Sequence, residues 1–280
     1  LQSDQIDALG RSIDDLTRQL AEASAAERPA LAEAFAELAQ GRSLAAEDAF
    51  ERAYEAQQRA AETAQRTMAE AARNVANLAL LRDIAKAVRF YRKALAAEAD
   101  DPETSRLLGH ALIVVGDLNE AEKALATSLA AASARADSWG QMAAQGGLGE
   151  VFLKTRDLAA AKGAFTATRR LAEDRLASDP ANIQWQRDLS VSHDRIGDVL
   201  LAQGDGPAAL AAYRQGLAIA EALTRRDPAN SEWQRDLSVS HIKIGDMLAA
   251  QGDGPAALAA YRQGLAIRAT LTRRDPANAE

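Results

Sequence analysis

The sequence predicts an all-α fold, a solenoid built of antiparallel helix pairs, and three observations support this. Residues 184–231 and 232–279 are identical at 39 of 48 aligned positions. The string Asp-Pro-Ala-Asn occurs at residues 179, 227 and 275, always 48 residues apart. Among the 280 residues 48% are hydrophobic and only 4% aromatic, a composition typical of closely packed helices. A fixed period of this size indicates a solenoid, in which each unit buries its core against its neighbours.

The last two repeats show the helix pair most clearly. Pro207 suits the first turn of a helix, because its missing N–H would have no partner there. Apolar residues follow it at helical spacing as far as Arg225 and Arg226, whose charges complement the helix dipole. Asp-Pro-Ala-Asn then ends this helix, and we expect Ser231 and Gln234 to form a capping box that starts the next one. Each repeat is therefore predicted to hold two helices of about 20 residues.

Small residues and one large aromatic recur at fixed positions in both repeats. In the first copy they are Ile196-Gly197, Leu200, Gly204, Ala209, Tyr213 and Gly216-Leu217. This pattern resembles the tetratricopeptide repeat (TPR), where small residues let two helices approach and the aromatic fills the gap opposite. Weaker copies lie upstream, so the predicted turns fall near residues 41, 82, 116, 156, 204 and 252. They predict about six TPR units over residues 29–280, and the resemblance implies a right-handed TPR-type α-solenoid.

Both ends of the sequence depart from the repeat. Residues 1–28 carry apolar residues at alternating spacings of three and four, namely Ile6, Leu9, Ile13, Leu16 and Leu20. We expect an amphipathic helix that caps the first repeat, and a coiled-coil stalk or dimer seam is the alternative. No signal peptide or transmembrane segment is recognised, which favours a cytoplasmic protein. The repeat stops within a unit at Glu280, so we expect the chain to be truncated there or its end to be buried against another chain.

Composition and motifs exclude most kinds of chemistry. The chain has no cysteine, and its three histidines are spread at His110, His193 and His241, which leaves little for a metal site. The net charge of −7 provides no positive field for nucleic acid. Gly146-Gly147-Leu148-Gly149 lacks the flanking strand and the Lys-Ser/Thr of phosphate loops, and we expect a kink or break there because glycine weakens a helix. We predict no catalytic residues, no cofactor, no metal, no nucleic-acid binding and no membrane insertion.

The resemblance to TPR proteins implies that partner binding falls on the concave wall formed by the first helices. The residues expected on this wall include Arg106, His110, Ile113, Glu150, Lys154, Asp194, Asp198, Leu201, Ile242 and Asp246. The carboxylates among them predict a protein or peptide partner with basic and apolar residues. TPR proteins that clamp the acidic tails of heat-shock chaperones use a lysine and an asparagine. Here those positions hold Asp194 or Ile242 and Asp198 or Asp246, so that activity is not expected.

We therefore expect a non-catalytic scaffold or sensor module that presents its concave face to a partner peptide or helix. One alternative is a self-assembly element that forms homo-oligomers through the N-terminal helix or the open C-terminal end. Another is the substrate-recognition arm of a larger bacterial signalling or defence protein, whose effector domain lies outside this segment. The excess of arginine over lysine is associated with a GC-rich bacterial source.

Overall fold

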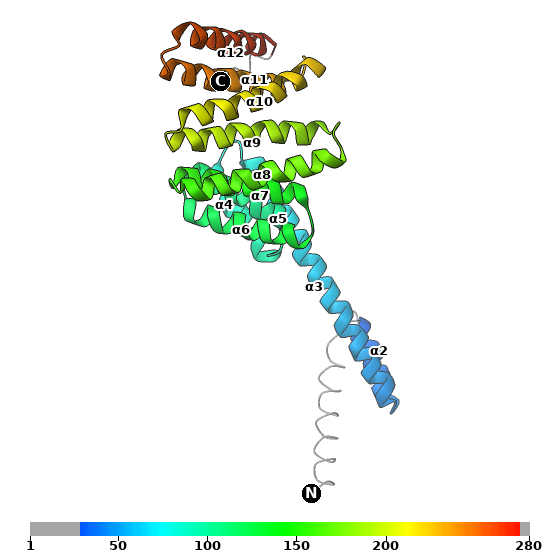
Figure 1. Ribbon diagram of the computed structural model, residues 1–280. Coiled ribbons are helices and arrows are strands. Elements are labelled where there is room, and N and C mark those ends of the chain that lie inside the picture. The colour runs from blue at the N-terminus through cyan, green and yellow to red at the C-terminus, as the bar shows by residue number, and fades with distance from the viewer. Residues whose placement is uncertain (1–28, 275–280) are drawn as a thin grey trace. The chain divides into compact units, whose positions relative to one another are not determined.

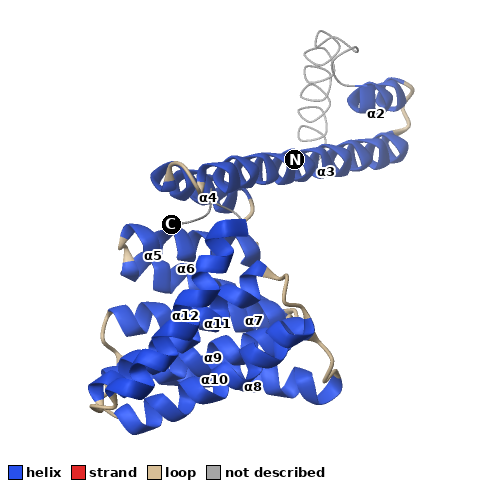
Figure 2. Ribbon diagram, turned by 90° about the horizontal axis from the view of Figure 1, so that it is seen from above, coloured by secondary structure: helices blue, strands red, loops and turns tan. Residues whose placement is uncertain are grey.

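The computed structural model describes residues 29–274, and every regular element within them is a helix (Figures 1 and 2). The predicted all-α class is confirmed. The helix expected in residues 1–28 lies outside the described residues. The chain divides into two compact units, Leu1–Glu70 and Ala71–Glu280, which we describe separately.

The described part of the first unit is a helix hairpin. Helix α2 spans Pro29–Ala39 and α3 spans Ser43–Ala79, with Gly41 between them in the left-handed conformation at φ +74°. The rings of Phe35 and Phe50 pack edge to face at a centroid distance of 4.8 Å. Two helix pairs with turns near residues 41 and 82 would need a break between them, but α3 is one helix of 37 residues. The physical reason is that residues 43–79 contain neither glycine nor proline, so nothing interrupts the helix.

The second unit is a stack of helices in which each helix from α4 onward contacts the next along the chain. The end of α3 packs into the same core as α4. The remaining helices follow in the order α4 Ile84–Ala97, α5 Pro102–Val115, α6 Leu118–Ala134, α7 Ser138–Lys154, α8 Leu158–Ser178, α9 Ile183–Ala202, α10 Gly206–Arg226, α11 Ser231–Ala250 and α12 Gly254–Arg274. Figure 1 shows α9 to α12 as successive layers of this stack.

Turns between helices lie at all six positions where the sequence places them. Three turns of the second unit carry a glycine at positive φ, Gly116, Gly204 and Gly252, and a fourth carries Arg156 at φ 64°. Pro207 lies in the first turn of α10, as expected. The expected capping box at Ser231 is wrong, because Asn230 is the N-cap and its Oδ1 accepts a hydrogen bond from the backbone N–H of residue 233 at 3.0 Å. An asparagine directly before the helix takes the capping position that we assigned to the serine.

The small residues of the repeat allow close helix packing. A Cβ added to Gly197 would lie 2.5 Å from Cε1 of Tyr213, so only glycine fits against the ring. Gly149 lies against Phe165 and Gly245 against Tyr261 in the same way, and Gly109 lies equally close to Leu125. The expected break near Gly146 and Gly147 does not occur, since α7 is continuous over Ser138–Lys154. Gly147 is buried, and an added Cβ would lie 2.7 Å from Leu125 Cδ2, so packing against α6 offsets the cost of glycine in the helix.

The first helices of successive pairs are α5, α7, α9 and α11. Helix α5 contacts α7 and α9 contacts α11, whereas the second helices of successive pairs contact each other less. The surface formed by α5, α7, α9 and α11 is called the first-helix face below. Across residues 29–274 no helix is long and apolar enough to cross a membrane.

Candidate partner-binding cleft

A cleft of about 290 Å³ opens on the first-helix face. Four helices line it. Helix α7 contributes Trp139, Ala143, Gly146 and Glu150, α9 contributes Gln184, Asp188, Val191 and Arg195, α5 contributes His110, and α8 contributes Phe165 and Thr168 at the base. The volume corresponds to roughly ten water molecules. The cleft is therefore suited to one or two side chains of a partner rather than to a large organic ligand.

The cleft exists because the middle of α7 presents the small residues Ala143 and Gly146 toward α9. Residues 139, 143, 146 and 150 recur at helical spacing and share one side of the helix. A Cβ added to Gly146 would meet no atom within 4 Å. Helices α7 and α9 also contact each other less than α5 contacts α7 or α9 contacts α11. A gap between two first helices therefore remains at this one junction.

The two ends of the cleft differ in chemistry. Helix α8 runs between α7 and α9 and is antiparallel to both, so the N-terminal ends of α7 and α9 lie at the same end of the cleft. Trp139 and Asp188 belong to that end, and Glu150 and Arg195 belong to the other. The Trp139 side chain is 43% exposed, and the Arg106 guanidinium carbon lies 5.0 Å from the centroid of its ring.

Asp188 is the least satisfied group of the cleft. Gln184 Nε2 donates a hydrogen bond to its Oδ1 at 3.0 Å, while its buried Oδ2 has no hydrogen-bond partner among the described residues. The pKa of this carboxyl is raised to about 6, mainly by burial. The hydrogen bond from Gln184 and the charge of Arg187 act to lower the pKa, and the charge of Glu232 on α11 acts to raise it. At pH 7 the carboxyl is thus mostly ionised but incompletely stabilised.

His110 closes the opposite end from α5. Burial is the main cause that lowers the pKa of its imidazole, and the nearby charge of Arg106 lowers it as well. The ring is therefore neutral at pH 7 and is able both to donate and to accept a hydrogen bond. The imidazole can therefore bind a polar group without adding a charge of its own to this end, where Glu150 and Arg195 also lie.

The structure brings only part of the predicted wall to the cleft. His110 and Glu150 line it, and Arg106 lies beside it with Nη2 2.6 Å from Glu103 Oε1. Ile113 is 6% exposed and packs in the core, because it faces the interior of the stack. The remaining predicted residues lie outside the cleft on α7, α9 and α11, namely Lys154, Asp194, Asp198, Leu201, Ile242 and Asp246.

Two of these carboxylates serve contacts between repeats. Asp194 Oδ2 accepts a hydrogen bond from Ser240 Oγ at 3.0 Å, and burial raises the pKa of Asp194 to about 6. Asp198 accepts hydrogen bonds from Tyr213 Oη at 2.8 Å and from Lys243 Nζ at 2.7 Å. Of these two carboxylates only that of Asp198 is paired with a cation, and Asp194 Oδ1 is buried with no hydrogen-bond partner among the described residues.

Sequence reasoning missed Trp139 and Asp188 as parts of a binding site. Trp139 lies outside the register of Trp185 and Trp233, which are 48 residues apart. That difference was the available signal, because a residue that breaks the repeat also changes what faces the next repeat.

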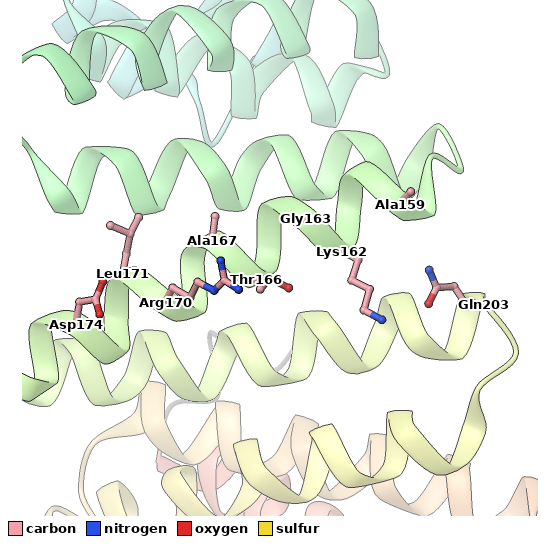
Figure 3. Close-up of a pocket in the computed structure, with 9 residues that line it drawn as sticks. All are labelled: Ala159, Lys162, Gly163, Thr166, Ala167, Arg170, Leu171, Asp174 and Gln203. Carbon is pink, nitrogen blue, oxygen red and sulfur yellow. The ribbon is translucent and has the colours of Figure 1, made fainter.

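A second, larger groove of about 620 Å³ runs along α8 (Figure 3). Lys162, Gly163, Arg170 and Asp174 lie along it, and Gln203 faces them from the end of α9. All of its lining residues except Gln203 come from α8. Since one side of a single helix provides nearly the whole groove, it offers fewer converging groups than the cleft between α7 and α9.

Neither hollow contains a metal site. Within residues 29–274, no three or more His, Asp or Glu side chains are grouped so as to hold a metal ion.

Comparisons with known proteins agree with the repeat architecture. A family model of the tetratricopeptide repeat matches residues 78–144. No curated protein of similar sequence is found. The fold is similar to that of BtubC (BKLC) from P. vanneervenii, with a TM-score of 0.57, 19% identity, and coverage of 75% of this chain and 91% of that one.

Two further solved structures are similar. A putative kinesin light chain from Podosopora anserina with nearly identical TPR-like repeats has a TM-score of 0.53 and 18% identity, covering 76% of this chain and 98% of that one. The Rap conjugation gene regulator of the plasmid pLS20, in complex with the Phr* peptide, has a TM-score of 0.55 and 14% identity, covering 72% of this chain and 53% of that one. At these identities the similarity concerns the fold. The described chain thus has an all-α, TPR-type solenoid fold.

Proposed function

We propose that this chain, which carries tetratricopeptide repeats, is a non-catalytic protein-interaction module that binds a segment of a partner protein in the cleft between α7 and α9. One observation carries the proposal: four packed helices direct aromatic, apolar and ionisable side chains into one space of about 290 Å³. Such a preformed hollow with few polar groups is typical of a binding site. The helices that hold it are rigidly packed, so little ordering entropy is lost on binding.

The chemistry of the cleft supports a partner with basic and apolar residues. Val191 and Ala143 offer apolar surface, and Asp188 and Glu150 offer carboxylates. The Rap regulator has a similar fold and is complexed with a peptide, and we propose a peptide-like segment as the ligand here as well. The wider role would be that of a scaffold or sensor arm, and no cofactor takes part.

The experiment uses two glycines that are alike except for their position. Gly146 lies in the cleft and Gly163 lies in the groove of α8. Each lies inside a helix, and a Cβ added to either would meet no atom within 4 Å. Gly146→Leu and Gly163→Leu should therefore both fold, since each replaces glycine by a better helix former. Circular dichroism checks this.

Short peptides would be selected on the full chain from a displayed random library, and their affinities measured by calorimetry. We expect Gly146→Leu to weaken binding by roughly tenfold or more, because leucine fills the cleft, and Gly163→Leu to leave it unchanged. Loss of binding in Gly163→Leu alone would move the site to α8. Equal binding to both variants, or failure to select any peptide, would overturn the proposal.

A second candidate function is self-assembly, and the end of the stack favours it. Leu258 and Leu265 on α12 are 49% and 66% exposed, whereas Leu210, which occupies the place of Leu258 on α10, is 7% exposed. Helix α11 of the next repeat packs on α10, whereas no described helix packs on the corresponding side of α12. Light scattering should then give the mass of an oligomer that Leu258→Glu with Leu265→Glu reduces to a monomer. A monomeric mass for the unchanged chain would exclude this candidate.

A further inference from the structure

We propose that the cleft between α7 and α9 binds an arginine side chain of the partner, whose guanidinium pairs with the carboxylate of Asp188. The inference rests on the proposed function and names the chemistry of its ligand. It comes from a comparison of two junctions within the same chain. One junction has Arg187 at the position where the junction with the cleft has Trp139.

At the α9–α11 junction, an arginine is paired with carboxylates of the next first helix. Arg187 Nε donates a hydrogen bond to Asp236 Oδ2 at 2.7 Å. Arg187 Nη1 also lies 2.8 Å from Glu232 Oε1. The guanidinium of one first helix therefore lies between two carboxylates on the next first helix, which is a favourable charge-assisted geometry.

The α7–α9 junction presents the same positions one repeat earlier. Asp188 and Gln184 precede Asp236 and Glu232 by 48 residues, and Trp139 precedes Arg187 by the same interval. The register is supported by packing. Gly149 lies against Phe165 as Gly197 lies against Tyr213, and both members of the second pair are 48 residues later.

The exchange of arginine for tryptophan accounts for the state of Asp188. In the later junction the aspartate at this position is paired with Arg187. In the earlier one a tryptophan stands in place of the arginine, and Asp188 Oδ2 is buried with no hydrogen-bond partner among the described residues. A buried carboxylate oxygen without a donor is costly. A guanidinium brought by a partner would supply the missing donor.

Three arginines lie near the cleft and already have acidic partners; Arg187, beside Asp188, is paired with Asp236 and Glu232. Arg106 is paired with Glu103, and Arg195 Nη1 lies 3.8 Å from Asp198 Oδ2. The apolar side chains of Val191 and Ala143 line the same cleft as Asp188. They suit the methylene stem of an arginine, which packs along apolar surface while its head group is charged.

The probe is N-acetyl-arginine amide, titrated into the ¹⁵N-labelled full chain and followed by NMR. We expect saturable shifts of the backbone amides of residues 139, 188 and 191. N-acetyl-citrulline amide has the same shape without the charge and should produce none of them. N-acetyl-lysine amide should bind more weakly, because an ammonium group cannot form the planar, two-pronged contact.

Three variants test the role of Asp188. Asp188→Asn should lower the affinity for the arginine probe by about tenfold or more. Trp139→Arg should have a similar effect, because it supplies an internal guanidinium in the position that Arg187 holds in the next repeat. Asp174→Asn removes a carboxylate from the groove of α8 and should bind the probe as the unchanged chain does.

Absence of saturable shifts, equal binding of the citrulline probe, or full binding to Asp188→Asn would overturn the inference. These outcomes are separable from failure of the proposed function. Suppose that the selected peptides contain no arginine, that Gly146→Leu weakens their binding and that Asp188→Asn does not. The cleft is then a binding site, and only its specificity for arginine is wrong. If no peptide depends on Gly146, the proposed function itself is wrong.

Discussion

Replacing Trp139 by arginine should favour the folded stack more at pH 7 than at pH 4. Burial raises the pKa of Asp188 from 3.8 to about 6. At 1.36 kcal/mol per unit, this shift means that ionised Asp188 costs the folded state up to roughly 3 kcal/mol at pH 7. An arginine at residue 139 could pair with Asp188 as Arg187 pairs with Asp236 at 2.7 Å, and would recover part of this cost.

Three losses oppose the gain. The stacking of Arg106 on Trp139, at 5.0 Å from the ring centroid, would disappear, which costs about 0.5–1 kcal/mol. Ordering a new arginine side chain costs about 1–2 kcal/mol of rotamer entropy. Loss of the ring also removes apolar burial, because Trp139 is only 43% exposed and the stem of an arginine replaces just part of its buried surface. The net change at pH 7 is therefore small, and the pairing is measured as a difference of up to roughly 2 kcal/mol between the effects of the substitution at pH 7 and at pH 4.

The dependence on pH identifies the source of the gain. The folded-state pKa of Asp188 is raised, so this group favours folding below pH 3.8 and that contribution is lost as the pH rises through about 6. The advantage of Trp139→Arg should therefore be present at pH 7 and shrink as the pH falls from about 6 to about 4. Asp194 has a similarly raised pKa, but it is common to both proteins and cancels in the difference.

The assay is urea unfolding at both pH values, with hydrogen exchange of the α9 amides as a local measure, because repeat stacks can unfold in parts. A double-mutant cycle with Asp188→Asn isolates the pair. The same stability difference at pH 7 and pH 4, or an undiminished difference in the Asp188→Asn background, would refute the reasoning.

Further predictions concern packing, a polar contact between repeats and the cleft. Gly197→Ala should destabilise the chain by about 1–3 kcal/mol in urea unfolding, because the added Cβ would lie 2.5 Å from the Tyr213 ring; unchanged stability would mean that the ring shifts freely. Gly146→Ala should instead raise stability by about 0.5–1 kcal/mol, since nothing lies within 4 Å of the added Cβ. Lys243→Ala should cost about 1–3 kcal/mol, because it removes the cation 2.7 Å from a half-buried aspartate, and Lys243→Arg should restore part of the loss. The affinity for the arginine probe should fall as the pH drops below about 6, because protonation of Asp188 removes the negative charge, and a flat pH profile of the calorimetric Kd would contradict this.

The parts of the fold that could be predicted are those fixed by residues within one repeat. Gly204 and Gly252 adopt φ +83° at their turns, a conformation that most other residues avoid. Gly197 and Tyr213 fix the approach of α9 and α10. The continuity of α7 through Gly146 could not be predicted in this way, because helix propensity is a weak force that packing overrides.

The candidate site was harder to predict because its properties depend on the neighbouring repeat. Position in the repeat placed Asp194 and Asp198 on the wall, but it could not show that Ser240 and Lys243 of the next repeat would bind them. Likewise, nothing in the local sequence of Asp188 shows that its carboxylate lacks a donor.

Identical residues in a repeat stack can have different functions, because the adjacent repeat determines their surroundings. Asp188 and Asp236 lie in the same nine-residue string, which begins at residues 185 and 233, yet one is paired with an arginine and the other has a buried oxygen without a partner. The difference comes from residues 139 and 187 on the preceding first helices. Where Arg187 faces Asp236, the two side chains satisfy one another and the contact is structural. Where Trp139 stands in place of an arginine, the aspartate opposite lacks that partner, and a repeat stack can thus offer a binding group at one junction without any difference in the fold.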